Sequence, residues 1–173
     1  MHRLSSLFRA LAASLAVLPL LVAGAAAEDI RVTPYGQAGY WQILAIFDAE
    51  QRFDHCMATV QYRSGARLSL NAHADGRVQM QVHDPAWPAR DLPKVPASLT
   101  LSEQRLEGVA ASMSGRSLFI EMTSLELALW RESRSLLVET PHEIISLGLN
   151  GAAAAVDGAE QCRAAGGVPP KQG

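Results

Sequence analysis

A two-residue alternation of apolar and polar side chains runs through much of the first half of this chain. Apolar residues occupy every second position in residues 56–62, 68–72 and 78–82. Successive side chains of a β-strand point to opposite faces, so this period predicts half-buried strands. Residues 41–47 are apolar at both sets of positions, which predicts a strand that is apolar on both faces.

The register of the predicted strands follows from the need to keep one face apolar. A two-residue loop before the strand at 78–82 would place Leu70 opposite Gln81 and mix the faces. A three-residue loop pairs Leu70 with Met80 and puts Gly76 where such loops need a positive φ. A similar loop at 64–66 would pair Val60 with Leu70. The result is an antiparallel meander with one apolar and one polar face.

A second set of elements follows a long connection, because four prolines in residues 85–96 interrupt the sheet. Hairpins are predicted around residues 99–122 and 136–149. Thr123 and Glu126 have the spacing of a capping box, which predicts a helix to about Arg134. Its buried stripe is predicted to consist of Leu125, Ala128 and Leu129.

An alanine-rich segment, residues 151–163, is predicted to form a last helix with Asn150 as its cap. The fold class is therefore α+β: one domain, residues 39–165, of mostly antiparallel meander sheet with two short helices packed on the apolar face. Residues 28–38 are predicted to be a lead-in, and residues 166–173 a disordered tail.

The first 27 residues have the order of a secretory signal peptide. His2, Arg3 and Arg9 precede an apolar run at 10–22 and small residues at 23–27. The run is shorter than the roughly 20 residues of a membrane-spanning helix, and a retained amphipathic anchor is the alternative. Cleavage after Ala25 or Ala27 would release a periplasmic or secreted protein that does not span the membrane.

Composition excludes two further classes. With 49% hydrophobic residues and a net charge of -2, the chain is not intrinsically disordered. Its 15 Lys and Arg against 17 Asp and Glu lack the excess of positive charge that nucleic-acid binding needs.

The two cysteines, Cys56 and Cys162, permit one disulfide in an oxidising compartment. Cys56 lies on the apolar face of its strand and Cys162 near the end of the last helix, so we expect Cα atoms within about 7 Å. Two buried free thiols are the alternative. His55 points to the opposite face from Cys56, which argues against a catalytic thiol.

No motif indicates a metal, a cofactor or a catalytic centre. His73 and His83 fall at opposite ends of one predicted hairpin and could not share an ion, so no metal is expected. The sequence also lacks a nucleophile elbow and a phosphate-binding glycine loop.

The polar face of the meander is the candidate binding surface. Its hydroxyl, amide and guanidinium groups could bind a polar ligand or a protein partner, and the alternative is a solvated face. A stiff loop adds Trp87, which would either anchor a partner or plug the core. The candidate residues are Arg67, Ser69, Asn71, Arg77, Gln79, Gln81 and Trp87.

The order of these pieces resembles the invasion-associated locus B family of exported bacterial proteins. The resembling segments are 41–43, 56–61, 66–70, 77–82, the helix at 125–134, and 146–151 with the alanine-rich helix after it. The resemblance implies a periplasmic or surface-associated protein without known catalysis and carries over no active-site residue. The sequence therefore predicts a small exported binding protein; a periplasmic hydrolase or enzyme inhibitor is the alternative.

Overall fold

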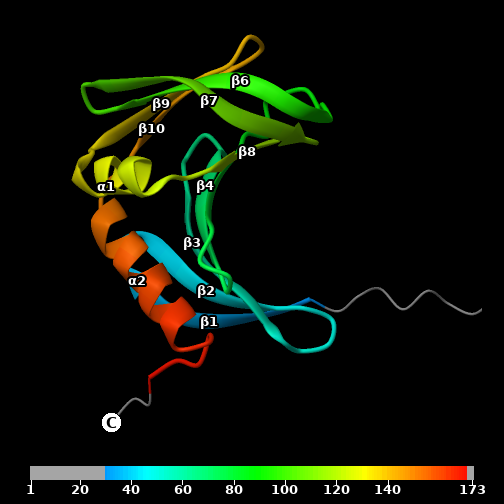
Figure 1. Cartoon of the computed structure of the whole chain (residues 1–173), viewed down its shortest axis with the longest axis vertical. Coiled ribbons are helices and arrows are strands. Elements are labelled where there is room, and N and C mark those ends of the chain that lie inside the picture. The colour runs from blue at the N-terminus through cyan, green and yellow to red at the C-terminus, as the bar shows by residue number, and fades with distance from the viewer. Residues whose placement is uncertain (1–29, 171–173) are drawn as a thin grey trace, which may run out of the picture.

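The computed structural model describes residues 30–170, and in that range ten strands form one antiparallel sheet with two helices (Figure 1). The strand order is β1-β2-β3-β4-β5-β8-β7-β6-β9-β10. This confirms the α+β class. The strands are β1 (Arg31–Ala38), β2 (Trp41–Phe47), β3 (Phe53–Gln61), β4 (Arg67–His73), β5 (Val78–His83), β6 (Leu92–Leu101), β7 (Gln104–Ser114), β8 (Ser117–Glu121), β9 (Ser135–Glu139) and β10 (Ile144–Gly148), and the helices are α1 (Ser124–Glu132) and α2 (Ala152–Ala164).

The predicted signal peptide, residues 1–27, lies outside the described residues. Within residues 30–170, neither helix has the length and apolar character needed to cross a bilayer.

The predicted register of the β4–β5 hairpin is confirmed, whereas that of the β3–β4 hairpin is wrong. Leu70 pairs with Met80, but Val60 pairs with Leu68 rather than with Leu70. The Tyr62 N–H donates to the Ala66 carbonyl at 2.8 Å, so the loop is residues 63–65 and not 64–66. Gly65 (φ 89°), like Gly76 (φ 91°), takes the last position of its loop. A glycine there supplies the positive φ at no steric cost, which is why the loop starts one residue earlier.

Residues 31–38 do not form the expected lead-in but the edge strand β1, which pairs with β2. Pro34 and Gly36 conceal this strand in the sequence, and the register shifts between them. Proline lacks an N–H to donate and is tolerated where one side of a strand faces no neighbour. A segment whose proline and glycine would indicate a turn can therefore form a strand at the edge of the sheet.

The capping box of α1 is confirmed, but its buried face differs from the prediction. Thr123 Oγ1 accepts from the Glu126 N–H at 3.2 Å, and the Glu126 carboxylate accepts from the Thr123 N–H at 2.6 Å. Glu126 and Trp130 are buried, whereas Leu125 is 63% exposed. Trp130 packs edge-on against Trp41 at 6.4 Å between ring centroids. The large indole surface, four residues after Glu126, thus sets the orientation of this short helix.

Helix α2 packs across the core face of β1 to β4 (Figure 1). Its N-cap is Gly151, in a left-handed conformation and without a side-chain cap, so the predicted Asn150 cap is wrong. The Asn150 carbonyl instead accepts a 2.9 Å hydrogen bond from Trp41 Nε1. The predicted disulfide between Cys56 and Cys162 is present, with Cα atoms 6.0 Å apart. It joins α2 to β3, the third strand of the sheet order.

The segment after α2 is ordered at its start, contrary to the expected disorder from residue 166. The Gly167 N–H donates to the Cys162 carbonyl at 2.9 Å, and Gly167 is buried. Gly167 packs against Ala45 and Phe47 of β2 and Phe53 of β3. Residues 171–173 lie outside the described range.

Candidate functional site

The outer face of the β3–β4–β5 meander points away from α2 and gathers most of the predicted binding residues. The register pairs Gln61 with Arg67, Thr59 with Ser69, and Ser69 with Gln81 across the three strands. The side chains of the outer face are His55, Met57, Thr59, Gln61, Arg67, Ser69, Asn71, His73, Gln79, Gln81 and His83.

The middle of this face is occupied by hydrogen bonds within the protein. Ser69 is 1% exposed and Asn71 is 7% exposed. The Ser69 and Thr59 hydroxyls lie 2.8 Å apart, and Gln81 Nε2 donates to Ser117 Oγ at 3.3 Å. Ser69 is therefore buried and engaged with Thr59, whereas Asn71 is buried with its Oδ1 lacking a hydrogen-bond partner among the described residues.

Arg77 and Gln79 are also engaged. Arg77 Nε donates to the Asp75 carboxylate at 2.7 Å, and Gln79 Nε2 donates to Glu121 Oε1 at 2.7 Å. The Arg77 guanidinium holds the pKa of Asp75 below its usual value. Both side chains thus stabilise the end of the meander next to β8.

Arg67 differs because it makes no ion pair with any residue in the range 30–170. It lies at the rim of a hollow of about 390 Å³ on the outer face of β2, β3 and β4. Tyr40, which is 83% exposed, stands at the β1–β2 turn on the same hollow. The lining residues are Tyr40, Gln42, Leu44, Met57, Thr59, Gln61 and Arg67.

Trp87, the remaining predicted binding residue, is not part of the outer face. It is 6% exposed and belongs to the hydrophobic core. The Trp87 backbone N–H donates to the Asp84 carbonyl at 3.1 Å, in a tight turn that directs the indole inward. Its burial agrees with the alternative interpretation, a plug at the edge of the core.

A second group of polar side chains at the opposite end of the β3–β4 hairpin escaped the sequence analysis. His55 pairs directly with His73, with ring centroids 5.1 Å apart. Asp54 Oδ2 lies 2.9 Å from His55 Nδ1. Burial lowers the pKa of His55, an effect that Asp54 opposes and the charge of His73 reinforces. The loop assumed at 64–66 would have set His55 opposite Asp75, so a one-residue error concealed the pair.

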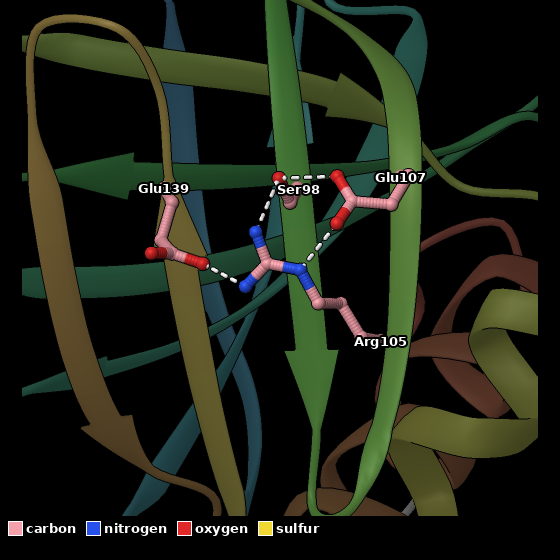
Figure 2. A network of polar contacts seen from close by, with 4 residues as sticks. All are labelled: Ser98, Arg105, Glu107 and Glu139. Atoms are coloured by element: carbon pink, nitrogen blue, oxygen red, sulfur yellow. Dashed lines mark hydrogen bonds and ion pairs between the residues drawn. The ribbon is translucent and has the colours of Figure 1, made fainter.

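A separate network joins β6, β7 and β9 (Figure 2). The Arg105 guanidinium lies between the carboxylates of Glu107 and Glu139 and donates to both, while Ser98 Oγ donates to Glu107 at 2.9 Å. Arg105, followed by Ser98, lowers the pKa of Glu107. Each of these groups has a partner within the network. The network therefore links β6, β7 and β9 to one another.

These features define a small, disulfide-closed α+β protein built on a single antiparallel sheet with a polar outer face. No protein-family model and no curated protein sequence matches the chain. Among solved structures, it is similar to the crystal structure of invasion associated protein B from Bartonella henselae, with a TM-score of 0.54 and 16% sequence identity. The alignment covers 75% of this chain and 97% of that chain. The resemblance expected from the sequence is thereby confirmed at the level of the fold.

Proposed function

We propose that this chain is a small exported binding protein without catalytic activity, which takes a small anionic ligand in the hollow beside Arg67. The observation that carries the proposal is the Arg67 guanidinium, which has no ion-pair partner in residues 30–170 and borders a hollow of about 390 Å³. Small-molecule sites typically enclose about 300–1,000 Å³.

The lining of the hollow suits a ligand with both charge and hydrogen-bonding groups. A guanidinium presents paired donors that fit a carboxylate or a phosphate. Gln42 and Gln61 add neutral polar groups, and Leu44 and Met57 add apolar surface, whereas the Thr59 hydroxyl is already bonded to Ser69. This combination favours an anion with a polar body over a protein partner, which would need a larger surface.

The same lining favours binding over hydrolysis. Its ionisable side chains are Arg67 and Tyr40, and it holds no carboxylate, histidine or thiol. General acid–base catalysis needs a group that titrates near the working pH, and nucleophilic catalysis needs an activated nucleophile. A hydrolase would therefore have to place its chemistry elsewhere.

Export is supported by the disulfide and by the leader sequence. Cys56 and Cys162 are both fully buried and joined across the core. Structural disulfides of this kind persist in oxidising compartments such as the bacterial periplasm. The predicted signal peptide, residues 1–27, would direct the chain into the export pathway.

An NMR titration with pairs of related solutes tests the proposed function. The ¹⁵N-labelled protein is titrated with glutamate against glutamine, and with N-acetylglucosamine 6-phosphate against N-acetylglucosamine. We expect the anionic member of at least one pair to shift amide resonances of residues lining the hollow more than its neutral counterpart. Arg67→Gln should abolish the preference, because it removes the charge and keeps an amide.

Arg63→Gln is the matched control, since it makes the same change of charge in the neighbouring β3–β4 loop, away from the lining. It should leave the titration unchanged. Shifts that avoid the hollow for every solute, or that survive Arg67→Gln, would contradict the proposal.

A further inference from the structure

We infer that Asp54, His55 and His73 form a binding site for a divalent transition-metal ion, with Zn²⁺ as the fitting probe. The site lies at the end of the β3–β4 hairpin opposite to the Arg67 hollow. Arg67 and His73 are the two ends of β4, six residues or roughly 20 Å apart at strand rise. The inference is therefore independent of the proposed ligand site.

The backbone holds the two imidazoles in the arrangement that brings cross-strand side chains closest. The Ala74 N–H donates to the Asp54 carbonyl on the β3 side. The His73 N–H points away from β3 and donates to the Arg77 carbonyl. His55 and His73 are therefore a non-hydrogen-bonded pair of the antiparallel ladder, whose side chains approach most closely. Their rings are inclined by 39° with centroids 5.1 Å apart.

Three donor atoms converge at this point. One ligating atom from each of Asp54, His55 and His73 lies within 4.8 Å of the other two. Donors around a tetrahedral zinc ion at bonds of about 2.0–2.1 Å stand about 3.3 Å apart. Rotation about side-chain torsions covers the difference, because the backbone already sets both imidazoles on one face.

One imidazole nitrogen of this cluster lacks a hydrogen-bond partner among the described residues. His73 Nε2 is buried and makes no hydrogen bond with any described residue. Leaving a buried polar atom unsatisfied costs roughly 1–3 kcal/mol, so such atoms in native proteins call for an explanation. Coordination of a metal ion would satisfy the nitrogen and use the lone pair of the neutral imidazole.

The surroundings attract a cation and leave room for water. Asp54 and Asp75 flank the pair, and the Arg77 guanidinium is bound to Asp75 and faces Glu121. The Asp54 side chain is 54% exposed, so an ion can enter from solvent and keep water in its open position. Two nitrogens and one carboxylate suit Zn²⁺, Ni²⁺ or Cu²⁺, whereas Ca²⁺ and Mg²⁺ require oxygen ligands.

Isothermal titration calorimetry with ZnCl₂ tests the site on protein purified without a histidine tag and freed of metal with EDTA. We expect one Zn²⁺ per chain and no heat of binding from CaCl₂. His55→Gln and His73→Gln should each weaken Zn²⁺ binding by at least about tenfold. His83→Gln is the matched control, because His83 shares the outer face but bonds to Ser117 Oγ at 3.1 Å, away from the cluster.

Imidazole ¹⁵N spectra of the unaltered protein decide the matter even if a variant fails to fold. Addition of Zn²⁺ should move the ring resonances of His55 and His73 and leave those of His83 and His142 in place. The inference is overturned by the absence of Zn²⁺ binding, by binding that both His→Gln variants retain, or by Zn²⁺-induced shifts confined to other histidines.

Discussion

The Tyr62 hydroxyl donates a 2.6 Å hydrogen bond to the backbone carbonyl of Gly148, 86 residues further along the chain. Tyr62 follows β3, whereas Gly148 ends β10, the last strand of the sheet order. Together with the bond from Trp41 Nε1 to the Asn150 carbonyl, it ties the end of β10 to the first strands. The sheet is thus curled so that its last strand approaches its beginning, with side-chain hydrogen bonds in place of a strand ladder.

Removal of the Tyr62 hydroxyl should weaken this closure. We expect Tyr62→Phe to lower the free energy of unfolding by about 1 kcal/mol, the usual net contribution of one hydrogen bond. Urea denaturation followed by tryptophan fluorescence measures the change. Tyr40→Phe, at a side chain that is 83% exposed, should leave the midpoint unaltered. Equal effects of the two substitutions would show that the Gly148 bond contributes nothing.

The same tyrosine should make the fold sensitive to alkaline pH. Burial raises the pKa of Tyr62 to about 12, from about 10 in an unfolded chain. Between these values the unfolded state loses its proton while the folded state keeps it, so stability falls as pH rises from about 10 to 12. Unfolding curves collected across this range should show the decline, and Tyr62→Phe should make it shallower. A decline of the same slope in the variant would assign it to other groups.

Alternation alone was enough to predict the strands of the meander, because half-buried strands show their two faces in the sequence. Their partners depend on loop geometry, and the register error at the β3–β4 loop came from one residue: Gly65 belongs at the end of the loop rather than in its middle. Strand β1 escaped prediction because Pro34 and Gly36 mask it and an edge tolerates both. The alternation of apolar and polar residues thus predicted where the strands lie better than it predicted which residues pair across them.

The candidate site was predicted only in part for the same reason. Arg67 could be placed on a polar face by parity, but its lack of an ion-pair partner could not be seen in the sequence. The hollow beside it is also lined by Tyr40 and Leu44. They lie next to β3 because β2 pairs with it, and that pairing was not predicted from the sequence. The His55–His73 pair likewise depends on a register that is fixed by tertiary contacts.

The disulfide should provide a large share of the stability of this small domain. Cys56 and Cys162 are 106 residues apart, and closing so long a loop restricts the unfolded chain strongly. We expect the double replacement Cys56→Ala and Cys162→Ala to cost about 2–5 kcal/mol in urea denaturation. A thiol assay on denatured, unreduced protein should find no free thiol. Two reactive thiols per chain would refute the bond.

Gly167 should not tolerate a side chain, for two separable reasons. Its φ is 75°, and an added Cβ would lie 2.9 Å from Ala45 Cβ and 2.9 Å from Phe53 Cδ2. Gly166→Ala provides the comparison, because Gly166 has a φ of 59° but no atom within 4 Å of an added Cβ. Both replacements carry the backbone penalty of about 1–2 kcal/mol.

Overpacking at Gly167 should add about 1–3 kcal/mol, so Gly167→Ala should be clearly the more destabilising of the two. Thermal unfolding of both variants measures the difference. Equal melting temperatures would indicate that the segment after α2 does not pack on β2 and β3 in solution.

The histidine pair should make the metal-free protein less stable in mild acid. Burial lowers the pKa of His55, and the charge of His73 acts in the same direction, although Asp54 partly opposes them. Below about pH 6.5 an unfolded histidine therefore takes up its proton before folded His55 does, which stabilises the unfolded state.

We expect the free energy of unfolding, measured in EDTA, to fall as pH decreases from 7 to 5. His55→Gln should flatten this dependence, whereas His142→Gln, at an exposed position, should retain it. The carboxylates whose pKa values are lowered by arginine partners, including Asp75 and Glu107, titrate below this window and cannot imitate the effect. If both variants keep the slope of the original protein, the pair is not the source of the acid sensitivity.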